Sequence, residues 1–295
     1  MKKLFATTVA TVLLATSAFG TTSYAAAVDT VVDGDSVNKT ELVKVNNSFA
    51  NYQKKSEVIL ANKFNTLSTT ELSKVEDDYQ KQIQALSDEE FDRFIHNVVK
   101  NNDKDVKQLQ QELDSIGVEL QIENKSSEFE IGTLAISPSE LDLSAYSVKR
   151  GGDSFWRLYS QWAVNKLEAY EASLDVVSIE WDSNVAKYYN AVVPADGPTT
   201  KRDGSQRLDG LYLFNVEDDS DFDSYAVVYV TKLKGEELHH GTKYEHTYAE
   251  WDSSFSVTAE VDITKSPISG ALSFTVNQQL NEKSWPRYED DILYW

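Results

Sequence analysis

The sequence predicts an α+β protein in which an N-terminal antiparallel helical bundle precedes a C-terminal antiparallel β-sandwich of jelly-roll type. Three observations predict this fold. Apolar residues recur at three- and four-residue steps over residues 39–117, which is helical spacing. The period changes to two residues at Val118. Turn signals then separate short apolar runs over residues 154–295, as in antiparallel sandwiches. We therefore expect a helical domain over 39–117 and a β domain over 118–295.

The first 27 residues have the three parts of a secretory signal peptide. Two lysines follow the initiator methionine, residues 4–15 form a short apolar core, and Ala25-Ala26-Ala27 offers small residues for cleavage. The apolar core is shorter than the roughly 20 residues that a transmembrane helix needs. We therefore expect residues 1–27 to be removed and the protein to be secreted, with possible retention at the cell wall left open.

The predicted bundle follows a flexible leader over residues 28–38 and contains four helices. Two of them begin with a capping box, Ser68 with Glu71 and Ser87 with Glu90, each just before an apolar stripe. Short links between the helices favour an antiparallel bundle. A rod-like stalk is the alternative, but the heptad spacing does not persist.

The β domain is predicted from alternation of apolar and polar residues. Val118, Leu120 and Ile122 alternate with polar neighbours, and several longer runs follow after residue 150. The expected strands are Phe155–Ala163, Ala172–Trp181, Leu208–Val216, Tyr225–Leu233, Lys243–Ile263, Ala271–Gln278 and Ile292–Trp295.

Composition excludes several classes of function. The formal net charge is −20, which repels nucleic acids and anionic lipids, so we expect no nucleic-acid partner. The chain has no cysteine, which removes disulfides, thiol nucleophiles and thiolate metal sites. An exported chain of this size without cysteine is typical of a bacterium. Beyond the first 27 residues no apolar run is long enough to cross a bilayer, so no integral membrane segment is expected in the mature chain.

The tryptophans are the candidate ligand-binding residues. All six lie beyond residue 150, among carboxylates and amides. Aromatic rings stack on the C–H faces of sugars while polar groups bind the hydroxyls, so this composition suits a glycan-binding surface. The predicted contact residues are Trp156, Trp162, Trp285 and Trp295. Core packing is the alternative, because large aromatic side chains also fill sandwich interiors.

A run of carboxylates is the candidate metal site. Asp218, Asp219, Asp221 and Asp223 lie in one predicted loop and could supply oxygen ligands to calcium. The EF-hand pattern fails, because Ser224 stands where that loop requires glycine. Calcium is thus the one cofactor that the sequence suggests. The alternative is that these residues form a solvated hairpin loop.

Other chemistries find little support. His239, His240 and His246 match no zinc spacing. Gly152-Asp153-Ser154 lacks the Gly-x-Ser-x-Gly pattern of a nucleophile elbow. A turn explains these residues better than a catalytic serine does. No pair of carboxylates stands out as the acid and base of a glycosidase. No catalytic residue is assigned. An enzyme is therefore the third hypothesis for the function.

The sequence therefore predicts a secreted, non-catalytic recognition protein. Its β domain would bind a glycan, a cell-envelope component or a protein partner. The alternative is a secreted β-pore-forming or toxin-like protein, because Ser253–Gln278 forms an amphipathic hairpin of the kind that inserts into membranes. Such a hairpin also fits a half-buried sandwich strand pair.

Overall fold

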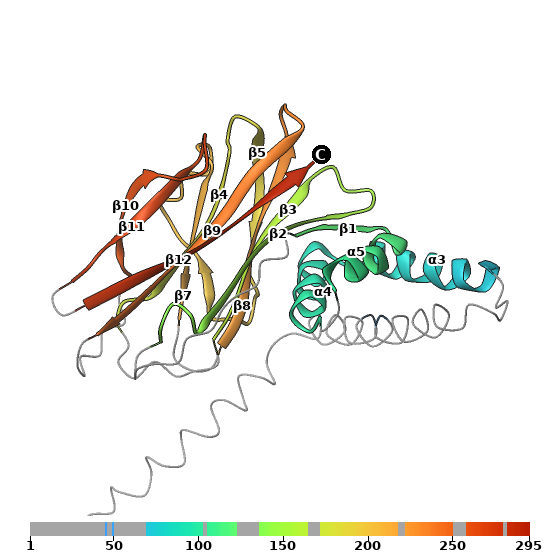
Figure 1. Ribbon diagram of the computed structural model, residues 1–295, viewed down its shortest axis with the longest axis horizontal. Helices are drawn as coiled ribbons and strands as arrows, with labels where there is room; N and C mark the ends of the chain where they lie inside the picture. Colours follow the sequence, from blue (N-terminus) through green and yellow to red (C-terminus); the bar gives the residue numbers. More distant parts are fainter. Residues whose placement is uncertain are drawn as a thin grey trace, which may run out of the picture. The chain divides into compact units, whose positions relative to one another are not determined.

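Twelve strands and three helices make up the described part of the chain (Figure 1). The computed structural model describes residues 45, 49, 69–102, 105–122, 136–164, 172–217, 222–249, 258–279 and 282–295. All of them belong to one unit, Val45–Trp295. The predicted signal peptide and leader lie outside the described residues.

The predicted α+β class with an N-terminal helical bundle is wrong, because the described residues form a mostly β structure. The helices that the structure describes at length are α3 (Thr69–Ala85), α4 (Asp88–Lys100) and α5 (Val106–Ser115). The capping box of Ser87 and Glu90 does begin α4. The spacing predicts the apolar stripe of α4, but spacing within a helix does not reveal which element packs against that stripe. Here α4 bonds to side chains of a β-sheet.

Two five-stranded antiparallel sheets form the body of the protein. Sheet A has the order β1-β2-β3-β8-β5, and sheet B has the order β12-β9-β4-β7-β6. The strands of sheet A are β1 (Val118–Gln121), β2 (Leu141–Arg150), β3 (Trp156–Val164), β8 (Phe222–Lys232) and β5 (Ala186–Val192). Those of sheet B are β12 (Glu282–Tyr294), β9 (Glu237–Ala249), β4 (Asp175–Trp181), β7 (Leu211–Val216) and β6 (Thr199–Lys201).

Apolar side chains from both sheets share one buried cluster, as in a β-sandwich. Leu158 and Val228 contribute from sheet A, and Val177 and Phe214 from sheet B. Each lies on a strand whose alternate residues face outward, since successive side chains of a strand point to opposite sides. The predicted sandwich half of the molecule thus corresponds to two facing sheets.

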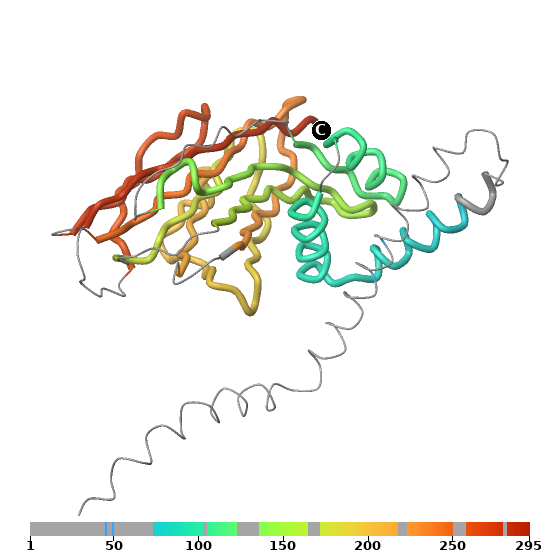
Figure 2. The backbone as a smooth tube through the Cα atoms, turned by 60° about the horizontal axis from the view of Figure 1, so that its bottom comes forward, coloured from blue at the N-terminus to red at the C-terminus, as the bar shows by residue number. Residues whose placement is uncertain are grey.

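The helices and a separate hairpin lie against the outer sides of the sheets. Both views place the helices beside sheet A, near β1 and β2 (Figures 1 and 2). Among the described helices, none has the length and apolar character that a membrane span requires.

The hairpin of β10 (Glu260–Lys265) and β11 (Leu272–Asn277) packs on sheet B. Phe274 is 1% exposed and lies in a small cluster with Val176 and Leu211. Each of the two described strands has six residues. Residues 253–257 of the predicted pore-forming hairpin lie outside the described residues.

Candidate functional site

The predicted tryptophan surface is divided between the core and the rim of the sandwich. Trp162 is fully buried and Trp156 is 5% exposed, and both belong to the cluster between the sheets. They lie on the same side of β3, as their even spacing requires. That side faces the core, so no ligand can stack on these two rings.

Trp285 and Trp295 are half-buried and pack against the same cluster. The Trp285 indole Nε1 donates a hydrogen bond to the Ile136 carbonyl at 3.0 Å. The Trp295 ring meets Trp156 edge to face at 6.4 Å between centroids. The four tryptophans thus form no shared exposed face, although the rims of two of them reach the surface.

The predicted calcium loop lies mostly outside the described residues, which include Asp223 but not Asp218, Asp219 or Asp221. The Asp223 carboxylate accepts hydrogen bonds from Lys100 and from His96, the latter at 3.1 Å. In the ranges that the structure describes, no group of three histidine or acidic residues could hold a metal ion.

The histidines of β9 do not converge on one point. His239 is exposed beside Glu237, at 3.3 Å. His240 is buried with its Nε2 3.5 Å from Asp291. His246 is also buried, with Nδ1 2.9 Å from Asp175 Oδ2. These are separate pairs along one strand, and each fits a structural role.

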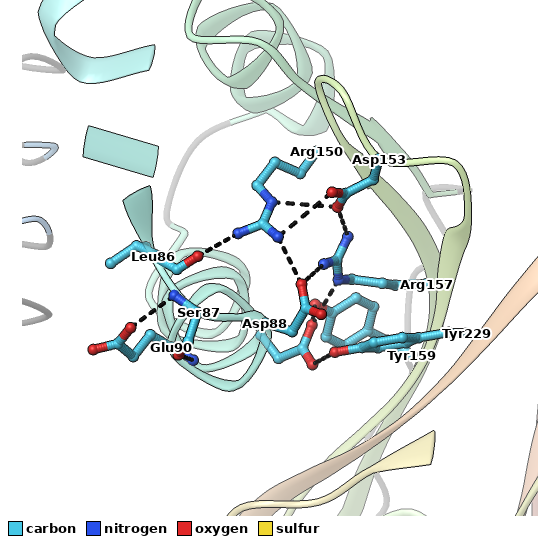
Figure 3. A network of polar contacts seen from close by, with 10 residues as sticks. Leu86, Ser87, Asp88, Glu90, Arg150, Asp153, Arg157, Tyr159 and Tyr229 are labelled. Carbon is cyan, nitrogen blue, oxygen red and sulfur yellow. Dashed lines mark hydrogen bonds and ion pairs between the residues drawn. The ribbon is translucent and has the colours of Figure 1, made fainter. Parts of the chain in front are cut away.

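The densest cluster of titratable side chains lies where α4 meets sheet A (Figure 3). Asp92 is fully buried and accepts hydrogen bonds from the hydroxyls of Tyr159 at 2.7 Å and Tyr229 at 2.5 Å. Arg157 Nε lies 3.0 Å from Asp92 Oδ1, as an ion pair without hydrogen-bond alignment. Burial raises the pKa of Asp92 to about 6, although Arg157 and both tyrosines act to lower it.

Two arginines extend this cluster to the ends of the helices. Arg157 donates to Asp88 at 2.8 Å and to Asp153 at 2.6 Å. Arg150 donates to Asp88 at 2.6 Å and to the Leu86 carbonyl just beyond α3 at 2.7 Å. A carboxylate with a raised pKa beside two tyrosines and an arginine is a common sign of an active site. Here Asp92 and Arg157 have no exposed surface, so this cluster holds α4 on the sheet.

An accessible pocket of about 380 Å³ lies at the loop between β6 and β7. Residues 202–209 and Tyr212 line it, and we call it the β6–β7 pocket. Its volume falls within the roughly 300–1,000 Å³ typical of small-molecule sites. Its lining combines guanidinium, carboxylate, amide and hydroxyl groups with one aromatic ring.

Internal hydrogen bonds give the pocket its shape. The Ser205 hydroxyl donates to the Arg202 carbonyl at 2.9 Å and accepts from the Leu213 amide at 3.0 Å. Gly210 has a φ of +81°, and a Cβ there would lie 2.0 Å from the Trp181 carbonyl oxygen. Only glycine can therefore bring the loop against β4, because any side chain would collide with that backbone.

One tyrosine, Tyr212, and two arginines, Arg202 and Arg207, line the pocket. Tyr212 stacks on Tyr188 of β5 at 5.7 Å between centroids, and the Arg207 guanidinium lies over the Tyr188 ring at 5.7 Å. Arg202 is fixed by hydrogen bonds to Asn215 at 2.8 Å and to the Ala259 carbonyl. The pocket therefore offers the exposed polar groups of Asp203, Gln206, Arg207 and Asp209 beside the largely buried Tyr212 ring.

The sequence reasoning missed this pocket. No motif in the sequence marks Gln206 or Arg207. The pairing of Tyr188 with Tyr212 joins strands of different sheets, which no spacing along the chain could indicate. The available signal was the concentration of polar residues and two glycines between two apolar runs.

Comparisons with known proteins identify no family. No family model and no curated protein matches the sequence. Among solved structures, the sixth cohesin of Acetivibrio cellulolyticus scaffoldin B, in complex with the Cel5 dockerin, is similar at a TM-score of 0.21 and 9% identity, over 30% of this chain and 74% of that one.

Two further structures show likeness of the same order. The Clostridium perfringens NetB toxin in its membrane-inserted form gives a TM-score of 0.27 and 7% identity, over 52% of this chain and 90% of that one. A structure on Streptococcus parasanguinis adhesion by Fap1 fimbriae gives a TM-score of 0.25 and 10% identity, over 55% of this chain and 86% of that one. At these TM-scores the likenesses support no inference about fold or function.

Proposed function

We propose that this chain is a non-catalytic recognition protein that acts outside the cell and binds a glycan through the β6–β7 pocket. The observation that carries the proposal is the accessible pocket of about 380 Å³, whose lining combines the Tyr212 ring with exposed polar side chains. Sugar hydroxyls both donate and accept hydrogen bonds, and the pocket presents arginine donors, aspartate acceptors and the Gln206 amide, which does both.

The site differs from the one that the sequence suggested. Trp156 and Trp162 lie in the core, and Tyr212 is 7% exposed and belongs to the same cluster. The exposed side chains that line the pocket are Asp203, Gln206, Arg207, Leu208 and Asp209. Leu208 is 77% exposed at the edge of the pocket. An apolar residue beside polar groups suits the mixed surface of a sugar ring. Export is supported by the pattern of the first 27 residues.

The test is co-sedimentation of residues 28–295 with purified bacterial cell wall, competed by soluble oligosaccharides released from the same wall. We expect Gln206→Ala combined with Arg207→Ala to weaken binding at least about tenfold, which is about 1.4 kcal/mol. The matched control is Lys234→Ala, which also removes one exposed positive charge but lies in the turn before β9.

Three outcomes are informative. Competed binding that fails only in the pocket variant supports the proposal. Equal binding by the pocket variant places the site elsewhere on the molecule. A parent protein that remains in the supernatant rejects the glycan function, and leakage of dye from zwitterionic lipid vesicles would then point to the pore-forming alternative.

A further inference from the structure

We propose that the β6–β7 pocket selects sugars that carry an oxyanion, either a carboxylate or a phosphate, and that Arg207 is the residue that binds this group. The inference rests on the proposed function and names the class of glycan that the same site takes. An acidic sugar would then bind the pocket more tightly than a neutral sugar of the same size.

The ion pairs of the arginines carry this inference. The chain has six arginines, and the structure describes all of them. Arg202 and Arg207 form no ion pair with any described residue, and both line the β6–β7 pocket. The remaining four are each paired with a carboxylate, and they are Arg93, Arg150, Arg157 and Arg287.

Carboxylates are not scarce in this chain, which has 48 acidic and 28 basic side chains. The lack of a partner is therefore a property of the place where these two arginines lie. A negatively charged ligand in the pocket would supply the missing partner.

Arg207 is exposed, and no contact with another described residue uses its hydrogen-bond donors. Its guanidinium carbon lies 5.7 Å from the centre of the Tyr188 ring, whose face attracts cations. A guanidinium presents its N–H donors in a planar fork that matches a carboxylate or a phosphate. Arg207 can therefore donate two parallel hydrogen bonds to an oxyanion of a ligand.

Arg202 adds a second positive charge to the pocket wall. Its guanidinium donates to Asn215 Oδ1 at 2.8 Å and to the Ala259 carbonyl. Both acceptors are neutral, so neither cancels the charge. Burial lowers the pKa of Arg202, which is the direction expected for a cation that no carboxylate stabilises. An anion bound in the pocket would stabilise this charge as well.

The two aspartates of the lining do not neutralise the arginines. Asp203 and Asp209 lie in the same loop, yet neither forms an ion pair with Arg202 or Arg207. Burial raises the pKa of the Tyr212 hydroxyl, and Arg207 lowers this pKa more than Asp203 raises it. At the Tyr212 hydroxyl, the positive charge of Arg207 thus acts more strongly than the negative charge of Asp203.

The negative charge of the whole molecule does not exclude an anion from this pocket. The formal net charge is −20, but it is spread over the entire chain. At physiological ionic strength, exposed charges more than about 8 Å apart are largely screened from each other. The groups that line the pocket therefore decide which ligand binds there.

Chemical-shift titration of the expected mature chain, residues 28–295 labelled with nitrogen-15, tests the inference with glucose, glucuronate and glucose 6-phosphate. These probes share one ring and differ in the group at its sixth carbon, so the comparison isolates the oxyanion. We expect an acidic probe to shift the amides of residues 202–209 and to bind at least about tenfold more tightly than glucose, equivalent to about 1.4 kcal/mol. The preference should shrink as sodium chloride is added.

Arg207→Gln replaces the guanidinium by a neutral amide and should reduce the preference for acidic probes to less than about twofold. Arg207→Lys keeps the charge but loses the planar fork, so it should keep only part of the preference. The matched control is Lys234→Gln, which removes an exposed positive charge outside the pocket and should keep the preference of the parent protein.

The outcomes separate this inference from the proposed function. A preference for one acidic probe alone supports the inference and identifies the oxyanion as a carboxylate or a phosphate. Equal binding of all three probes at residues 202–209 overturns the inference but leaves the glycan site in place. A preference that Arg207→Gln does not reduce also overturns it. If no probe shifts these amides, the inference is rejected, and co-sedimentation with cell wall decides separately whether the protein binds glycans.

Discussion

At the scale of single residues, Asp92 is the group whose environment departs most from water. It is a carboxylate without exposed surface, held by two tyrosine hydroxyls and one arginine. The fold raises its pKa from 3.8 to about 6, because burial outweighs the attraction of Arg157. The folded protein therefore binds more protons than the unfolded chain between about pH 4 and pH 6.

Asp92→Asn should remove this proton uptake. The raised pKa means that the free energy of unfolding of the parent protein falls, relative to the variant, as pH rises from about 4 to about 6. Above pH 6 the difference should be constant. The total change is about 3 kcal/mol, at roughly 1.4 kcal/mol per pKa unit. Urea unfolding of both proteins at several pH values measures it.

The difference between the two proteins isolates Asp92 from its neighbours. Burial lowers the pKa of His96. Burial acts to raise the pKa of Asp223, but hydrogen bonds from Lys100 and His96 lower it. Both shifts make acid destabilising, and both are present in each protein, so they cancel. A pH-independent difference would show that Asp92 is ionised in the fold throughout this range.

At the scale of elements, the β10–β11 hairpin is attached to sheet B by a few specific contacts. Buried Glu180 accepts hydrogen bonds from Ser266 at 2.5 Å and Ser273 at 2.6 Å. Lys243 donates to the Phe274 carbonyl at 2.7 Å. The hairpin therefore covers a charged stretch of the sheet, and its apolar contribution rests largely on Phe274.

Phe274→Ala should destabilise the protein by about 3–5 kcal/mol, the usual loss for a buried phenylalanine. The matched control is Ile263→Ala, opposite Phe274 in the hairpin register but 39% exposed, which should cost less than about 1 kcal/mol. Thermal unfolding followed by circular dichroism measures both. Similar effects of the two changes would mean that the hairpin does not pack on sheet B through Phe274.

At the scale of the whole molecule, one apolar cluster joins the two sheets. Trp162 of sheet A meets Tyr244 of sheet B edge to face, at 5.8 Å between centroids. The Ser160 and Thr242 hydroxyls are hydrogen-bonded across the same interior at 2.6 Å. Since both sheets contribute to this cluster, we expect them to unfold in a single transition.

Trp162→Ala should remove about 3–5 kcal/mol of stability, whereas Trp295→Ala should remove less than half of that, since Trp295 is half-buried at the edge of the cluster. Urea unfolding followed both by circular dichroism and by the remaining tryptophan fluorescence gives both values. Two separate transitions, or equal losses for the two tryptophans, would contradict a shared core.

The sequence by itself determined where several elements lie and which side of each is apolar. It placed the start of β9 at Lys243 instead of Glu237, and that of β12 at Ile292 instead of Glu282. Alternation located β3, β4, β7 and β8 within a few residues, and the capping box located the start of α4. It did not locate β2 (Leu141–Arg150), which is absent from the expected strands. It also failed at β5, which has little alternation and carries a register shift between Tyr188 and Asn190.

Only the tertiary structure decided what each apolar or aromatic side faces. The spacing of Trp156 and Trp162 fixed that they share a side of β3, but not that the side is the core. The stripe of α4 indicated a buried helix, but not that tyrosines and arginines bury it. The Tyr212 ring that lines the β6–β7 pocket stacks on Tyr188, and these two residues lie on strands of different sheets. Periodicity reports the angle between neighbours along one element, whereas a site depends on contacts between elements, which only the packed chain creates.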